Sequence, residues 1–256
     1  MPANKYKQFG YSIIATITIA ILTTILLLDP IAQDPAYHQF KDSRIFLAIP
    51  NFLNVSSNLA FLFVGLLGIY KILITKSLKI NDDFKSAYLL LFTSLILISI
   101  GSSYYHLAPD NLSLAWDRLA MAIGFMSLLS IVIYEYISPR AGKFILLPAI
   151  LLGISSVIYW ILTEEHGVGD LRAYILVAFF PVLLTPATLL LFRSNYNSYH
   201  GYIWLLLGYL LAKLSEHFDA QIFIATGLIS GHSLKHLFAA LGFYLLLKYY
   251  ENRLQQ

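Results

Sequence analysis

The chain has 256 residues, of which 58% are hydrophobic and only 12% are charged, and its formal net charge is +3. Soluble domains carry roughly a quarter of their residues as Asp, Glu, Lys or Arg, so this deficit indicates a chain surrounded by lipid. The small, dispersed charge gives no sign of nucleic-acid binding. The absence of cysteine excludes disulfides and thiolate metal ligands.

Eight hydrophobic stretches are long enough to cross a membrane, which takes about 20 residues. They cover residues 10–28, 50–73, 86–106, 114–137, 143–163, 171–192, 200–218 and 231–250. The first ends at Asp29 and Pro30 without a cleavage pattern, so we interpret it as a retained helix and not as a signal peptide. The sequence predicts an all-α transmembrane bundle that forms a single membrane domain over residues 1–256, with a seven-helix core at 50–250.

Basic residues in the connections and at the helix ends are distributed unevenly between the two sides of this bundle. Eleven lie on one side: Lys5, Lys7, Lys71, Lys76, Lys79, Lys85, Arg140, Lys143, Arg193, Lys248 and Arg253. Four lie on the other: Lys41, Arg44, Arg118 and Arg172. The positive-inside rule therefore predicts that both termini are cytoplasmic. We expect an integral protein of a bacterial cytoplasmic membrane, with the 29–49, 107–113, 164–170 and 219–230 connections facing outward.

Three polar clusters occur at helix ends on the predicted outer side. They contain Ser102 and His106, Asp117 and Arg118, and His232 and His236, in chain order. Ionisable residues inside spanning helices are costly unless they face a cavity or a partner, so each is a candidate site. A spacing of four residues places Ser102 with His106, and His232 with His236, on one helix face. Ser230 is a suitable N-cap for the last helix. All three clusters should converge just inside the outer interface.

Three neutral imidazoles with an open fourth position are an arrangement typical of catalytic zinc. Zinc lowers the pKa of a bound water toward about 7. Asp117 would then accept a proton and return it to a leaving group, while Ser102 would donate a hydrogen bond to a developing oxyanion. An isolated His-x-x-x-His pair is a weak signal, however. Two alternatives are a pair of haem ligands and, for Asp117, a simple ion pair with Arg118.

Further polar residues near the same depth are candidates for outer-sphere support. Glu216 and Asp219 lie at the end of the seventh predicted helix, where they would either surround the metal ligands or be partly solvated. Lys235 lies between the two C-terminal histidines and could pair with Asp117 or with an outer acid.

The order Ser102-x-x-x-His106, then Asp117, then His232-x-x-x-His236 resembles the alkaline ceramidase family, here as a bacterial member. That family belongs to a superfamily of seven-helix membrane hydrolases that includes the adiponectin and progestin receptors. The segment from Ile49 to Asn58 is also similar to the family's first-helix entry, and the similarity runs from about Tyr37 to Tyr250. The helix at 10–28 is additional to the family's seven.

The resemblance implies that His106, His232 and His236 bind Zn²⁺, that Asp117 activates the metal-bound water and that Ser102 stabilises the oxyanion. The implied substrate is a long-chain N-acyl sphingoid lipid of the membrane, cleaved to a fatty acid and an amine. Eukaryotic members also hold Ca²⁺ through acids before their first helix. Few of those acids are present between Tyr37 and Arg44, and Asn51 stands where an acid is expected, which argues against calcium.

The alternative function is a non-enzymatic receptor or an ion-coupled transporter that uses the same buried residues. A transporter needs a polar pathway that reaches the inner side. The inner helix halves 89–98, 125–134 and 237–247 have no ionisable group other than tyrosine, which favours a one-sided site. The oligomeric state is left open by the sequence.

Overall fold

The computed structural model describes residues 3–254, with side chains from residue 6 onward, and over that range it is built from helices without a β-strand. The α-helices are α1 (Ala3–Leu27), α2 (Phe52–Ser56), α3 (Leu59–Leu73), α4 (Lys85–Leu107), α5 (Asn111–Val132), α6 (Pro139–Glu165), α7 (Arg172–Leu191), α8 (His200–His217), α9 (Asp219–Thr226) and α10 (Gly231–Asn252). Short 3₁₀-helices occupy Pro35–His38 and Asp82–Phe84, and a π-helical turn follows α5 at Ile133–Ile137. The predicted all-α fold is confirmed.

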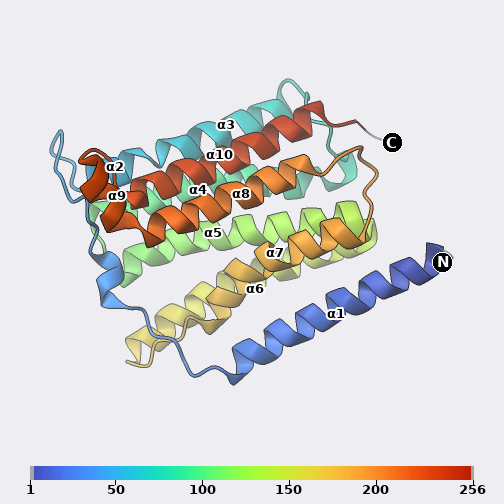
Figure 1. Ribbon diagram of the computed structural model, residues 1–256, viewed down its shortest axis with the longest axis horizontal. Coiled ribbons are helices and arrows are strands. Elements are labelled where there is room, and N and C mark those ends of the chain that lie inside the picture. Colours follow the sequence, from blue (N-terminus) through green and yellow to red (C-terminus); the bar gives the residue numbers. More distant parts are fainter. Residues whose placement is uncertain (1–2, 255–256) are drawn as a thin grey trace.

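The long helices run side by side along the longest axis of the molecule (Figure 1). α9 lies at one end, here called the α9 end, and α1 begins and α10 finishes near the opposite end. Six segments of the described chain are long and apolar enough to cross a membrane: Tyr6–Leu27, Phe52–Leu73, Asp82–Leu107, Asn111–Ile137, Pro139–Glu165 and Arg172–Leu191. These segments indicate an integral membrane protein.

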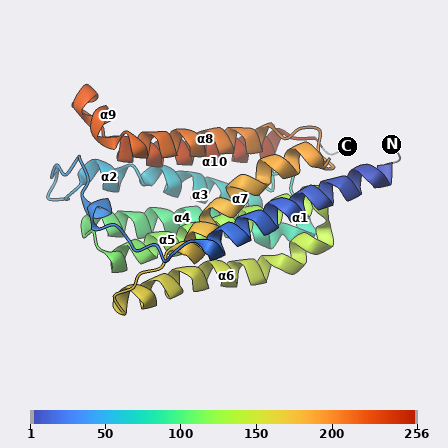
Figure 2. The same cartoon turned by 60° about the horizontal axis from the view of Figure 1, so that its bottom comes forward.

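The other two expected spans form α8 and α10, which are 18 and 22 residues long. Both helices are continuous but more polar than the six, because they carry Lys213 and Glu216 on α8 and the two histidines and Lys235 on α10. They pack against each other along their length (Figure 2). The polar residues that lower the hydropathy of these two helices belong to the candidate site or lie next to it.

Two local features differ from the expected spans. The stretch at 50–73 is not one helix: it is interrupted between α2 and α3, where Asn54 and Asn58 are fully buried and the Asn58 amide donates to the Asn54 carbonyl at 2.8 Å. Side-chain bonds of this type compete with regular helix bonds. The connection at 219–230 contains the short helix α9, which ends at Gly227 in a left-handed conformation with φ 63°.

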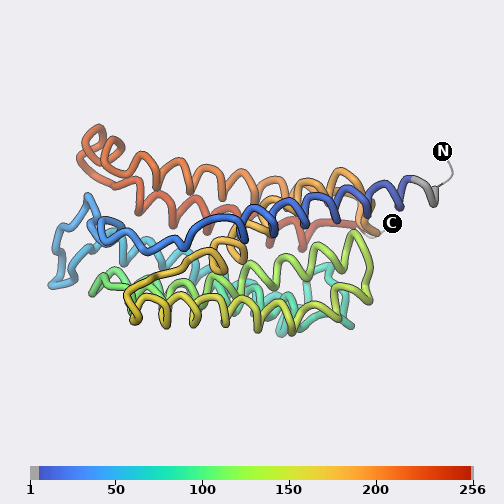
Figure 3. Tube along the Cα trace, turned by 90° about the horizontal axis from the view of Figure 1, so that it is seen from below, coloured from blue at the N-terminus to red at the C-terminus, as the bar shows by residue number. Residues whose placement is uncertain are grey.

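α1 lies at the periphery of the bundle. It packs along α7, and only 6% of its apolar window is buried inside the protein (Figure 3). Its remaining surface, rich in Ile and Leu, is suited to lipid contact.

Close helix approaches bring the polar clusters together at the α9 end. A Cβ added to Gly101 on α4 would lie 2.8 Å from the carbonyl oxygen of Trp116 on α5. A Cβ added to Gly231 would lie 2.0 Å from the carbonyl oxygen of Ser215 on α8. Both distances are shorter than a van der Waals contact, so only glycine permits these helix pairs to meet this closely. The glycines thereby position the neighbours Ser102, Asp117 and His232.

Candidate metal centre

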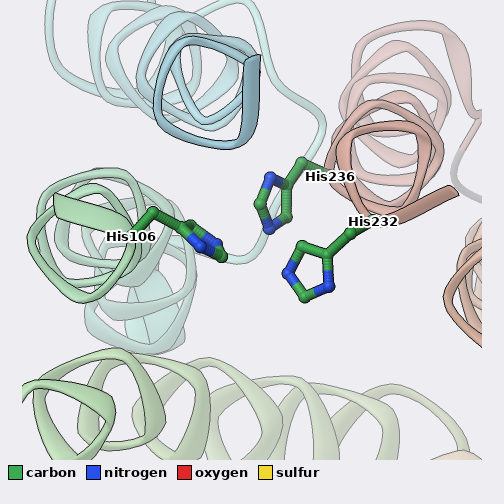
Figure 4. A group of neighbouring side chains, drawn as sticks. All are labelled: His106, His232 and His236. Atoms are coloured by element: carbon green, nitrogen blue, oxygen red, sulfur yellow. The ribbon is translucent and has the colours of Figure 1, made fainter. Parts of the chain in front are cut away.

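Three histidines from two helices converge at the α9 end of the bundle. His106 comes from the last turn of α4, and His232 and His236 come from the first two turns of α10 (Figure 4). One ligand atom from each lies within 4.8 Å of the others, and the ring centroids are 4.9–5.1 Å apart. Their side chains are 0%, 6% and 4% exposed, respectively. The convergence expected from helix depth and spacing is therefore present.

The environment of His106 fits a metal ion. Its imidazole is completely buried, and neither ring nitrogen has a hydrogen-bond partner among the described residues. A buried polar atom without a partner costs about 1–3 kcal/mol, and such atoms are rare in folded proteins. Coordination of a cation by one nitrogen would remove much of this cost. A donor set made only of neutral imidazoles suits zinc, copper, iron or nickel better than calcium or magnesium.

The imidazole of His236 is oriented by a hydrogen bond to Ser57. The Ser57 hydroxyl lies 2.8 Å from Nδ1 of His236 and itself donates to the carbonyl oxygen of Asn54 at 3.1 Å. When the serine proton is directed at Asn54, Nδ1 of His236 is the donor in the other bond. The lone pair of Nε2 is then free for a cation, which is the usual tautomer of a metal-ligating histidine.

His232 is fixed through its backbone at the start of α10. Ser230 caps this helix by accepting a hydrogen bond from the backbone N–H of Ser233, as predicted. Asp219 accepts a hydrogen bond of 2.7 Å from the backbone N–H of His232. Both contacts satisfy amides that the helix itself leaves free. Asp219 therefore holds, through the backbone, the helix turn that carries the histidine.

An aromatic side chain from the long first connection packs against two of the three histidines. The ring centroid of Phe40 lies 4.6 Å from that of His106 and 4.9 Å from that of His232. Covering the cluster with an apolar ring excludes water and lowers the local dielectric constant. This contact could not be inferred from sequence, because nothing in the connection at 29–49 marks Phe40 as different from the other aromatic residues.

Asp117 and Ser102 line a cavity that also reaches His236. The cavity has a volume of about 290 Å³ and runs between α3, α4, α5, α7, α8 and α10. Asp117 is 9% exposed and takes part in no ion pair within the described part of the chain. The alternative that Asp117 only neutralises Arg118 is therefore not what the structure contains. The Asp117 carboxylate is available to a ligand in the cavity.

Lys235 and Glu216 form an ion pair at the same end of the cavity. The Lys235 ammonium bonds to one carboxylate oxygen of Glu216, and Lys213 bonds to the other. Of the two partners considered for Lys235, the outer acid is thus the one it contacts. Tyr37 donates to the same carboxylate at 3.2 Å. Burial raises the pKa of Tyr37 above its usual value although Lys235 lies close by, so its hydroxyl stays protonated as a donor.

A second buried charged group, which the sequence reasoning missed, lies at the opposite end of the bundle. Glu135 in the π-helical turn pairs with Arg253 at 2.8 Å, and both side chains are fully buried. Tyr88 and Tyr202 donate hydrogen bonds to the two carboxylate oxygens of Glu135 at 2.5 and 2.7 Å. The segment 125–134, on which the expectation of an inner side without ionisable groups was based, ends one residue before Glu135, so that expectation is incomplete. In the sequence, the feature that could have indicated this pair is a glutamate inside an apolar stretch.

The chain matches no protein-family model, and no curated protein is similar to it in sequence. The structure and the residues themselves are therefore the basis for assigning a function.

Proposed function

We propose that this protein is a zinc-dependent lipid amide hydrolase of the membrane, similar to alkaline ceramidases, that cleaves an N-acyl sphingoid lipid to a fatty acid and an amine. The observation that carries the proposal is the buried group of His106, His232 and His236 beside a cavity that exposes Asp117 and Ser102. The resemblance of these five residues, in order and spacing, to the ceramidase pattern supports the choice of reaction.

The shape and lining of the cavity suit a lipid. Away from the polar end, its walls are the apolar side chains of Met121, Phe125, Leu128, Leu205 and Phe243. Sites that bury long apolar ligands are lined in this way, with few polar groups placed to fix orientation. An acyl chain in this part of the cavity would place its amide at the polar end, next to Asp117.

The residues have complementary roles in amide cleavage. A bound Zn²⁺ would supply a water of lowered pKa and polarise the amide carbonyl. His106, His232 and His236 would hold the ion, and the Ser57 hydroxyl would keep His236 in the ligating tautomer. Asp117 would take the proton of the attacking water and deliver it to the departing nitrogen. The Ser102 hydroxyl would donate a hydrogen bond to the carbonyl oxygen as negative charge develops there.

One observation keeps the transporter as a second candidate. The Glu135–Arg253 pair places ionisable groups at the end of the bundle opposite the histidines. A transporter that uses both groups would depend on Glu135 as strongly as on Asp117, whereas a hydrolase requires only the groups at the α9 end.

The decisive experiment measures zinc content and turnover on the same purified samples. The detergent-solubilised protein is incubated with a panel of N-acyl lipids, products are identified by mass spectrometry, and metal is measured by elemental analysis. We expect about one zinc per chain and release of fatty acid. His236→Ala should lose both metal and activity, because it removes a ligand.

Variants of the other two groups separate ligation from catalysis. Asp117→Asn should retain most of the metal but lose activity by about 10²–10⁴-fold. Ser102→Ala should lose about 10²-fold. Ser103→Ala is the matched control, because its hydroxyl bonds to the carbonyl oxygen of Val55 and does not line the cavity. Hydrolysis by Asp117→Asn at the rate of the parent protein would refute the assigned roles, and the absence of any transition metal would refute the mechanism.

A further inference from the structure

Arg118 is a buried cation on the cavity wall. Its side chain is 8% exposed, and its guanidinium carbon lies 4.1 Å from the ring centroid of Trp160 and 5.0 Å from that of Tyr174. One terminal nitrogen, Nη2, donates to the side-chain carbonyl of Gln33 at 2.5 Å. The aromatic faces and this single bond fix the plane of the guanidinium within the protein.

The other terminal nitrogen of Arg118 has no hydrogen-bond partner in the described part of the chain. Nη1 is buried and makes no hydrogen bond within residues 6–254, and over the same range Arg118 forms no ion pair with a carboxylate. Buried charges in proteins are ordinarily paired or coordinated, because an unpaired one is expensive. Gln33 is neutral and satisfies only part of the five-donor fork. The arrangement suits a planar anion that arrives with a ligand.

The charges around the cavity also leave room for one anion. Its lining contains the cations Arg118, Lys213 and Lys235 and the carboxylates Asp117 and Glu216. Glu216 is bonded to both lysines at once, so it already serves two cations. With the histidines neutral, three positive charges face two negative ones. In a low-dielectric site this surplus favours a ligand with negative charge.

The position of Arg118 indicates which part of a lipid amide would carry this charge. Arg118 directly follows Asp117, so the two side chains project from the same helical turn at the polar end of the cavity. Leu128 lies ten residues further along α5, about 15 Å deeper at 1.5 Å per residue. An acyl chain directed toward Leu128 and Phe243 leaves the amine half of the amide at the polar end, within reach of Arg118.

We propose that the substrate is an N-acyl lipid whose amine half carries an anionic group, a carboxylate or a phosphate, that is bound by the guanidinium of Arg118. That the bound lipid is a substrate rests on the proposed amide hydrolysis, but the anion site can be tested by binding alone. It narrows the head group of the lipid, which the resemblance to ceramidases leaves open.

Two matched lipid pairs test the inference and distinguish the two anions. N-oleoylglycine and N-oleoylethanolamine differ by a carboxylate in place of a hydroxymethyl group, and ceramide 1-phosphate and ceramide differ by a phosphate. The dissociation constant of each lipid is measured with the purified full-length protein from ligand-induced thermal stabilisation, and each sample is then analysed for cleavage by mass spectrometry. Measurements are made with the parent protein, Arg118→Gln and Arg118→Lys.

We expect the anionic member of one pair to bind the parent protein about 10- to 100-fold more tightly than its neutral partner, the range for a hydrogen bond to a charged group. Arg118→Gln should lose this preference, so that the anionic and the neutral member bind with similar dissociation constants. Arg118→Lys should keep part of it, because the charge remains but the planar fork is lost. Arg44→Gln is the control: Arg44 is an exposed cation at the same end, paired with Asp42 outside the cavity, and its loss should leave the preference intact.

Equal binding of both members in both pairs by the parent protein would overturn the inference, whether or not Arg118→Gln folds. A preference that survives unchanged in a folded Arg118→Gln would overturn it too. Anion preference without cleavage of any lipid would support the anion site and refute the hydrolase. Cleavage restricted to neutral amides, with no anion preference, would support the hydrolase and refute the anion site.

Discussion

Removal of a single hydroxyl outside the proposed ligand set should weaken zinc binding. In Ser57→Ala, Nδ1 of His236 loses its hydrogen bond to the Ser57 hydroxyl, which lies at 2.8 Å. The imidazole is then free to rotate or to carry its proton on Nε2, the nitrogen that faces the other histidines. Loss of such a partner to a ligating histidine costs about 10- to 100-fold in metal affinity, or about 1.4–2.8 kcal/mol.

The assay is a competition titration of the zinc-loaded, purified protein with a chelator of known affinity. Ser56→Ala is the matched control, because its hydroxyl makes only a long contact of 3.5 Å to the carbonyl oxygen of Leu53. Ser57→Thr retains a hydroxyl and should bind zinc nearly as tightly as the parent. Parent-like affinity in Ser57→Ala would refute the reasoning. So would an equal loss in Ser56→Ala, because the effect would then come from the interrupted helix and not from the imidazole.

Three further expectations concern stability and topology. Arg253→Met should destabilise the protein by about 3–5 kcal/mol because it leaves the Glu135 carboxylate buried and unpaired, and adding Glu135→Gln should restore part of the loss in detergent unfolding curves. The hydrogen bond from Arg172 lowers the pKa of the Asp170 carboxyl to about 2. The stability that this ionised carboxylate contributes is present at neutral pH and is lost as the pH falls from about 4 to about 2. Asp170→Asn should therefore flatten the fall in Tm over that window, and an unchanged Tm profile would contradict this. A reporter that works only after export should stay silent when fused to the C-terminus, and activity would reverse the predicted orientation.

Much of the fold could be predicted because it depends on local sequence. Each helix expected from an apolar stretch is present, since a membrane-spanning segment must satisfy its backbone bonds internally and must be apolar over most of its length. The boundaries agree to within a few residues except for α1, which begins at Ala3 instead of residue 10, and for the interruption between α2 and α3. That interruption depends on buried asparagine bonds that apolar composition does not reveal.

The three histidines could be expected to converge for a related reason. Helix rise fixes the depth of His106, His232 and His236 in the bundle, and alternating helix direction brings those depths to one end. The spacing of four residues fixes the shared face on α10. These are properties of position along a helix, so a single sequence contains them.

Partner choice among side chains was decided only by the tertiary structure. The sequence allowed Asp117 to pair with Arg118 and Lys235 to pair with Asp117. In the folded chain Arg118 instead donates a hydrogen bond to Gln33, and Lys235 forms an ion pair with Glu216. The bond between Ser57 and His236 joins residues 179 positions apart. Such contacts depend on the rotation of each helix about its own axis and on the close approaches at Gly101 and Gly231, which are set by the packing of all the helices together. A pattern within one helix gives the face on which a side chain lies, but only the packed neighbour determines the atom that this side chain meets.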